Sequence, residues 1–155
     1  MIYAKSITTS KNTLSTSPLE TILKITKGLV YFLEVYFPPG PSGLLHIRID
    51  DGNYQLLPAT EGETLYGDNV TVRYDDLYIK NAEPYQFKIY TYNEDDTYNH
   101  TLQVRVGLVS KEVFQARFLP TMAYDYFNKL IEAAGKQQIE ARKLRTQEIL
   151  ESLKG

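Results

Sequence analysis

The sequence of 155 residues contains no cysteine and no tryptophan, and its formal net charge is only −2 at pH 7. Without cysteine, a disulfide-stapled secreted domain, a thiol nucleophile and a cysteine-type zinc site are all excluded. Proteins that bind mainly phosphate groups usually carry a basic excess. We therefore expect no nucleic-acid partner.

Long hydrophobic segments are also missing. The longest apolar run, Gly28 to Phe37, is interrupted by Glu34 and is shorter than the roughly 20 residues that a membrane-spanning helix needs. The first ten residues, MIYAKSITTS, lack the apolar stretch of a signal peptide. We expect a protein that is made in a cytoplasm and has no membrane partner.

Known catalytic and nucleotide-binding motifs are absent as well. The sequence contains no G-x-S-x-G nucleophile elbow, no phosphate-binding glycine loop and no EF-hand spacing. His46 and His100 lie on predicted strands, where we interpret them as structural or surface residues. The acidic clusters at 50–51, 75–76 and 94–96 lie where turns are expected, and Asp commonly occupies turns for backbone reasons. We expect no catalytic residues, no cofactor and no metal.

Alternating apolar and polar residues dominate the centre of the chain. This alternation predicts a half-buried strand in each of several short segments. The predicted strands are residues 29–37, 45–49, 54–57, 70–74, 77–79, 85–90 and 100–108. Asp51-Gly52 is a strong signal for a tight hairpin turn. Because no helical pattern separates these segments, an antiparallel sandwich or barrel is expected.

The two ends of the chain differ from its centre. Between Ser6 and Thr21, nine of sixteen residues are Ser or Thr, so residues 1–20 are interpreted as an extended N-terminal arm. Residues 21–110 are assigned to the β-sandwich, and residues 111–155 to a linker and a C-terminal helix. Strong helix formers begin at Tyr124, after a candidate cap at Thr121, and Gly135 interrupts them.

The apolar positions of the predicted helix do not keep one heptad register across this glycine. Leu130, Leu144 and Leu150 are candidate contacts for self-association or for a partner. Tyr90, at the end of a predicted strand, and Tyr92, just beyond it, are further candidate contacts.

The stretch VYFPPGPSG, residues 35–43, interrupts two predicted strands. Its prolines limit backbone freedom and remove hydrogen-bond donors, whereas its glycines permit turns with positive φ. Pro38, Pro39, Gly40 and Pro41 form either a stiff corner of the sandwich or a preformed contact loop. Both interpretations remain open from the sequence.

Several of these segments together resemble small virion proteins of tailed bacteriophages. The resemblance covers about residues 22–109 and is carried by the stretches ITKG, VYFPPGPSGLLHIRI, QLLP and YTYNEDDTYNHTLQVRVGL. Such proteins are β-sandwich capsid-decoration or head-fibre components. The resemblance implies docking on a capsid and self-association, and it brings no catalytic residues.

From these observations we predict a mainly β, antiparallel jelly-roll-like β-sandwich with an extended N-terminal arm and a C-terminal α-helix. The predicted function is that of a non-enzymatic structural protein of a bacteriophage virion, a capsid decoration or other accessory component. It would form a homo-oligomer and contact capsid or other virion proteins.

Two other functions are kept as alternatives. The first is a carbohydrate-binding module that exposes tyrosines, with calcium near Asp95 and Asp96. Its candidate rings are Tyr85, Tyr90, Tyr92 and Tyr98. The second alternative is a hydrolase that uses Asp95 and Asp96 as an acidic pair.

Overall fold

The computed structural model describes residues 1–118 and 124–152. The chain divides into two compact units, Met1–Val109 and Ser110–Gly155. Each unit is described here by itself. None of the helices within the described ranges is long and apolar enough to cross a membrane.

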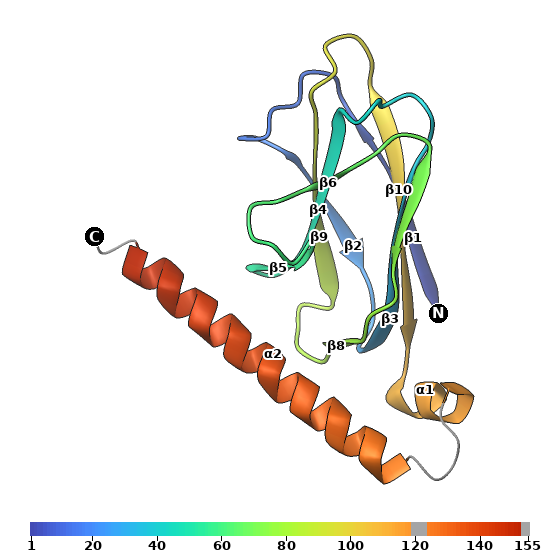
Figure 1. Cartoon of the computed structure of the whole chain (residues 1–155), viewed down its shortest axis with the longest axis vertical. Helices are drawn as coiled ribbons and strands as arrows, with labels where there is room; N and C mark the ends of the chain where they lie inside the picture. The colour runs from blue at the N-terminus through green and yellow to red at the C-terminus, as the bar shows by residue number, and fades with distance from the viewer. Residues whose placement is uncertain (119–123, 153–155) are drawn as a thin grey trace. The chain divides into compact units, whose positions relative to one another are not determined.

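The first unit is a sandwich of two antiparallel sheets (Figure 1). One sheet has the order β1-β10-β3-β7 with β8 also paired to β3, and the other has the order β2-β9-β4-β5 with β6 also paired to β4. The strands are β1 (Ile2–Thr9), β2 (Leu19–Lys24), β3 (Gly28–Phe37), β4 (Leu45–Asp51), β5 (Tyr54–Leu57), β6 (Leu65–Tyr66), β7 (Val70–Tyr74), β8 (Tyr78–Lys80), β9 (Gln86–Asn93) and β10 (His100–Val109).

This strand order is that of a jelly roll. Counting β5 with β6 and β7 with β8 as interrupted strands gives eight positions in two four-stranded sheets, the arrangement of two interlocked Greek keys. The chain passes back and forth between the sheets, and each sheet contributes its inward-facing side chains to one core. The predicted fold class, a mainly β jelly-roll-like sandwich with a C-terminal helix, is confirmed.

The core lies between the sheets and is made of alternate residues from each strand. Phe37 and Phe87 are fully buried in it, as are most inward residues of β4 and β10. In β3 the alternation shifts at Tyr31, because the register against β10 skips one residue beside Gly107. A Cβ on Gly107 would lie only 2.2 Å from the ring of Phe32, so glycine gives that ring its space.

The expectation of a separate N-terminal arm is wrong. Ile2–Thr9 form β1, which pairs with β10 along its whole length, and Leu19–Lys24 form β2, which pairs with β9. Met1–Val109 is therefore one unit, in place of an arm at 1–20 and a sandwich at 21–110. Both strands are sheet edges, and most of their residues are exposed or half-buried, so their sequences contain few apolar residues at regular spacing.

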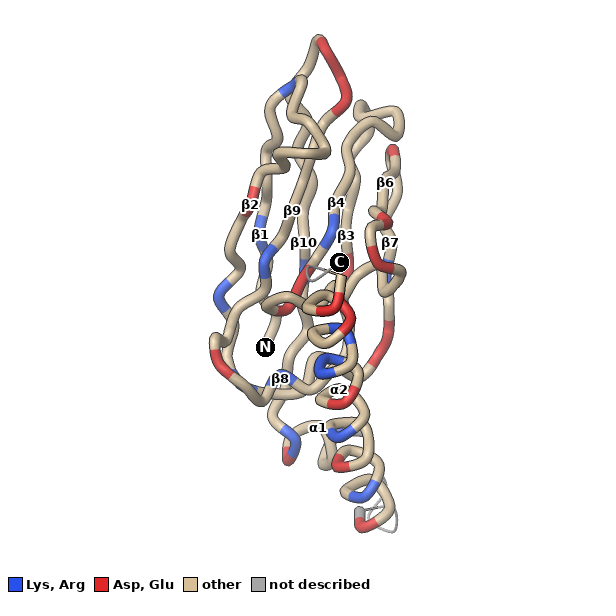
Figure 2. The backbone as a smooth tube through the Cα atoms, turned by 90° about the vertical axis from the view of Figure 1, so that its left-hand side faces the viewer, with Lys and Arg blue, Asp and Glu red and all other residues tan. Residues whose placement is uncertain are grey.

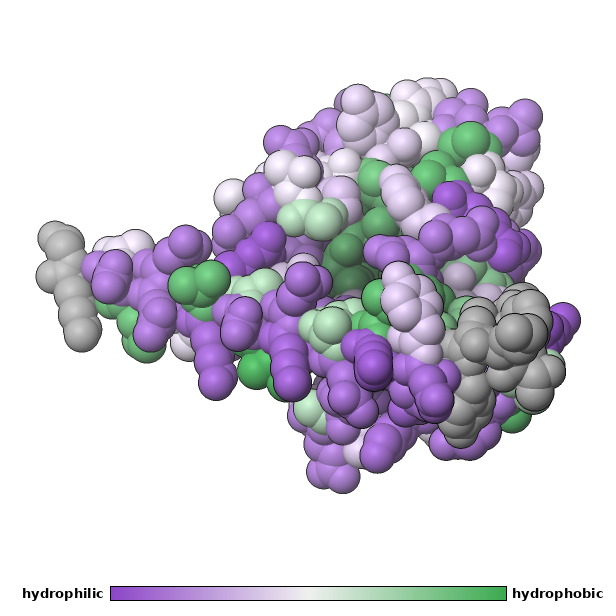
Figure 3. Space-filling view, turned by 60° about the horizontal axis from the view of Figure 1, so that its bottom comes forward, coloured by the Kyte–Doolittle hydropathy of each residue, from purple (hydrophilic) through white to green (hydrophobic). Residues whose placement is uncertain are grey.

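The second unit contains α1 (Lys111–Phe118) and α2 (Tyr124–Ser152). The segment interpreted as a linker therefore contains a helix, whereas the candidate cap Thr121 lies outside the described residues. The rings of Phe114 and Phe127 stack with centroids 5.2 Å apart. Helix α2 runs unbroken through Gly135, and hydrophilic residues cover much of its visible surface between separate hydrophobic patches (Figure 3).

Candidate interaction site at the loop end of the sandwich

Loops from both sheets meet at one end of the sandwich and are hydrogen-bonded to one another (Figure 1). The loop after β1 joins the loop after β9 through the amide of Asn12, which donates to the carbonyl of Asp95 at 2.8 Å. The amide of Lys11 also donates to Asn99 Oδ1 at 2.9 Å. Because these hydrogen bonds lie within the chain, they order the loops at this end without a partner.

The proline loop between β3 and β4 belongs to this end and is held by a side chain from another loop. Asp68 Oδ1 accepts the amide of Gly40 at 2.8 Å and that of Ser42 at 3.0 Å. Gly40 has φ of 130°, which an L side chain rarely adopts. Pro41 is buried, whereas Pro39 and Gly40 are exposed. The loop is thus a corner that Asp68 holds in place, and its tip at Pro39 and Gly40 faces solvent.

Replacing Asp68 with alanine removes both hydrogen bonds that its carboxylate accepts from the proline loop. We expect the free energy of unfolding to fall by about 1–2 kcal/mol, because two charge-assisted hydrogen bonds are lost from an exposed site. Hydrogen exchange of the Gly40 and Ser42 amides should accelerate. Asp68→Asn, which keeps the acceptor oxygen, is the control and should stay closer to wild type. Unchanged exchange in Asp68→Ala would contradict the bracing role.

The acidic loop between β9 and β10, red at the upper end of Figure 2, is organised by Asp95. Its Oδ1 accepts the amides of Thr97 at 2.7 Å and Tyr98 at 3.0 Å, and its Oδ2 lies 2.7 Å from His100 Nε2. The backbone amide of Thr97, followed by that of Tyr98 and by His100, lowers the pKa of Asp95. The turn interpretation of residues 94–96 is therefore confirmed.

The carboxylates at 50–51 do not follow the turn interpretation, because Asp50 and Asp51 belong to β4. Asp51 is buried, and its Oδ1 lies 2.6 Å from the ammonium of Lys80, which is buried too. Tyr78 donates its hydroxyl to Asp51 Oδ2 at 2.6 Å. This ion pair joins β4 of one sheet to β8 of the other. In the sequence, Leu77 and Ile79 alternate with Tyr78 and Lys80, a pattern that favours the two apolar residues as the inward ones, so the buried lysine was not predicted.

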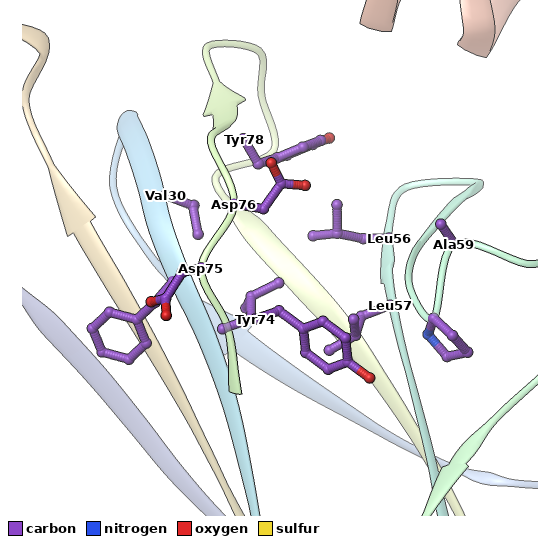
Figure 4. Close-up of a pocket in the computed structure, with 11 residues that line it drawn as sticks. Val30, Leu56, Leu57, Ala59, Tyr74, Asp75, Asp76 and Tyr78 are labelled. Atoms are coloured by element: carbon purple, nitrogen blue, oxygen red, sulfur yellow. The ribbon is translucent and has the colours of Figure 1, made fainter. Parts of the chain in front are cut away.

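A cavity of about 400 Å³ opens beside this cluster, between β3, β5 and the segment from β7 to β8. Figure 4 shows Leu56, Leu57 and Ala59 facing Tyr74, Asp76 and Tyr78 across it. Its lining is mostly apolar. No sequence motif pointed to it, because its walls come from segments that are distant along the chain.

Tyr90 and Tyr92 lie on β9, on the solvent-facing side of their sheet. Arg48 covers Tyr90, with its guanidinium carbon 4.7 Å from the ring centroid. Burial, with contributions from Glu20, raises the pKa of Tyr90 to about 12. Tyr92 instead stacks on His46, with centroids 4.3 Å apart and planes 8° from parallel.

His46 is held between its neighbours. Its Nδ1 lies 2.9 Å from Thr64 Oγ1, and its Nε2 lies 3.7 Å from Glu94 Oε2. Tyr66 is the next ring, with its centroid 5.2 Å from that of His46. Thr64 and Tyr66 lie between the predicted strands 54–57 and 70–74, where no element was predicted, so this ring cluster was not predicted.

His46 makes stability depend on pH. Burial lowers its pKa below the usual 6.5, against an opposing effect of Glu94. The unfolded chain therefore binds a proton more readily, and stability falls as pH drops through the unfolded pKa. We expect the melting temperature of His46→Gln to fall less than that of wild type between about pH 7.5 and pH 5. An equal fall in both proteins would contradict this role.

The candidate contacts on α2 are exposed. Leu130 is 48% exposed, Leu144 59% and Leu150 52%. These leucines belong to the second unit, whereas Pro38–Pro41, Tyr90 and Tyr92 belong to the first. The predicted contact residues are therefore divided between two units.

Comparison with protein-family models and with curated proteins found no match. In the part of the chain that the structure describes, no group of three or more His, Asp or Glu side chains is placed to hold a metal ion.

Proposed function

We propose that this chain is a non-enzymatic structural component of a tailed-phage virion, a capsid decoration or other accessory protein. It is made in the host cytoplasm, docks on capsid or other virion proteins, and self-associates. It has no nucleic-acid or membrane partner. The observation that carries this proposal is the hydrogen-bonded loop end of a jelly roll.

The jelly roll supports the proposal because it recurs in viral capsid proteins, although it also recurs in lectins. A fold alone does not define a function. The loop end adds a more specific argument. Asp68 and Asp95 order the backbone of two neighbouring loops, so docking costs little conformational entropy. A surface whose loops are already ordered suits a protein that binds many identical positions on a lattice.

The second unit supports self-association. Leu130, Leu144 and Leu150 are each about half exposed on one long helix, and exposed apolar side chains of this kind are candidates for burial against a partner. Closed homo-oligomers are the usual outcome when identical chains associate. An oligomer would also present several loop ends together, which strengthens docking on a repeating surface.

Cosedimentation with particles tests the proposal. The purified chain is mixed with capsids of the phage that encodes it, and bound protein is measured in the pellet. The variant Lys11→Glu with Pro39→Glu places two carboxylates on exposed positions of the loop end. The control Lys27→Glu with Asn53→Glu makes the same charge change at exposed loops of the opposite end.

We expect wild type and control to sediment with the capsids and the loop-end variant to remain in the supernatant with an unchanged melting temperature. Failure of the wild-type chain to bind would contradict the virion function. Equal binding by both variants would contradict the role of the loop end. A lower melting temperature in the loop-end variant alone would instead favour the corner interpretation of the proline loop.

A further inference from the structure

The solvent-facing side of the sheet β2-β9-β4-β5 carries a compact cluster of rings. Tyr66 on β6 and Tyr92 on β9 are both cross-strand neighbours of His46 on β4. Together with Thr64 and Glu94 we call these residues the tyrosine patch. His46 and Tyr92 stack in parallel, whereas Tyr66 is tilted by 45° to His46 and is 63% exposed. The Tyr66 ring is therefore open to solvent and lies beside the stacked rings of His46 and Tyr92.

Polar atoms surround the rings. Thr64 Oγ1 lies 2.9 Å from His46 Nδ1 and 3.3 Å from the Tyr92 hydroxyl. The carboxylate of Glu94 stands beside His46, and its side chain is 57% exposed. The hydroxyls fix the rings in place, while the carboxylate remains accessible to a ligand. The patch thus combines an exposed aromatic face with a strong hydrogen-bond acceptor.

From this arrangement we propose that the tyrosine patch binds a neutral pyranose of a glycan. The C–H face of a pyranose packs on an aromatic ring such as Tyr66, and its hydroxyls donate hydrogen bonds to a neighbouring carboxylate such as Glu94. The same carboxylate repels acidic sugars. This binding activity is additional to the virion function and does not depend on it.

The chemistry of the patch favours a sugar over other ligands. Nucleic acids are disfavoured because Glu94 would face phosphates and the chain has a net charge of −2. A stable protein interface generally needs more than about 1,000 Å² with anchors in desolvated pockets. The patch instead offers one tilted, exposed ring with a polar surround, which matches the size of a single sugar.

This site differs from the one that the sequence indicated. Only Tyr92 is shared. Tyr90 is covered by Arg48, and Tyr98 lies on the loop between β9 and β10. Asp95, one of the two residues expected near calcium, uses Oδ1 for two backbone amides and Oδ2 for His100. The tyrosine patch needs no calcium in order to present its carboxylate.

A panel of immobilised glycans, followed by titration with the methyl glycoside of the terminal sugar that binds, tests the proposal. A dissociation constant of about 1 mM is expected for a single site, because one sugar offers few contacts. Tyr66→Ala should weaken binding at least about tenfold. The matched control is Tyr98→Ala, because Tyr98 is an equally exposed tyrosine (67%) outside the patch, and it should bind like wild type.

Glu94→Gln gives a second readout. It should weaken binding of the neutral sugar and remove the discrimination against the corresponding uronic acid, without changing the melting temperature. The proposal is overturned if wild type binds no neutral glycan, or if Tyr66→Ala binds as well as Tyr98→Ala. If, in addition, Tyr66→Ala fails to sediment with capsids, the patch is a protein contact and not a sugar site.

Discussion

Replacing Lys80 with methionine is expected to lower the free energy of unfolding by about 3–5 kcal/mol, because it removes one partner of a buried ion pair. Lys80 is 2% exposed and Asp51 4% exposed, with the ammonium 2.6 Å from the carboxylate. Methionine retains most of the apolar stem but leaves the negative charge of Asp51 without its counter-charge. Urea unfolding at neutral pH measures the difference.

Two further variants separate the ion pair from general packing. Lys88→Met removes a lysine whose ammonium is 3.9 Å from Glu20 and whose side chain is 34% exposed, and it should change stability by no more than about 0.5 kcal/mol. Lys80→Met combined with Asp51→Leu should recover most of the lost stability, since an apolar pair replaces an ionic one. If Lys80→Met lowers the free energy of unfolding no more than Lys88→Met does, the ion pair does not stabilise the fold.

Ile7→Asp is expected to lower the free energy of unfolding by about 3 kcal/mol or more, since it removes a buried side chain and buries a carboxylate. Ile7 is 3% exposed and belongs to the core of the sandwich. Its neighbour Ser6 points to solvent from the same strand, so Ser6→Asp is the matched control.

The control should change stability by no more than about 0.5 kcal/mol. Thermal and urea unfolding of the two variants measures whether β1 is part of the sandwich. If the first residues formed a free arm, both substitutions would be equally harmless. Equal, small effects would therefore contradict the position of β1 in the sheet.

The central strands could be predicted from the sequence because they are buried on at least one face and alternate clearly. The residues of β10 from His100 to Leu108 show this best, and β4 and β9 follow the same pattern. The edge strands could not. In β1 only Ile7 and Thr9 are fully buried, so the Ser- and Thr-rich sequence gave no periodic signal. Its pairing depends on β10, which lies far away along the chain.

The candidate sites were less predictable than the fold. The rigid character of the proline loop followed from its composition, but its brace did not, because Asp68 is a lone acidic residue in a different loop. The ring cluster depends on β6, a two-residue strand that is too short to show alternation. Both sites are products of strand register, which local sequence specifies only in part.

Mass spectrometry of gradient-purified phage particles tests the virion function most directly. Particles of the phage that encodes this chain are banded by density, washed and digested, and peptides of the chain are quantified against the major capsid protein. The virion function predicts that the chain bands with the particles at a fixed ratio across the peak. Peptides confined to the unbound protein at the top of the gradient would contradict it.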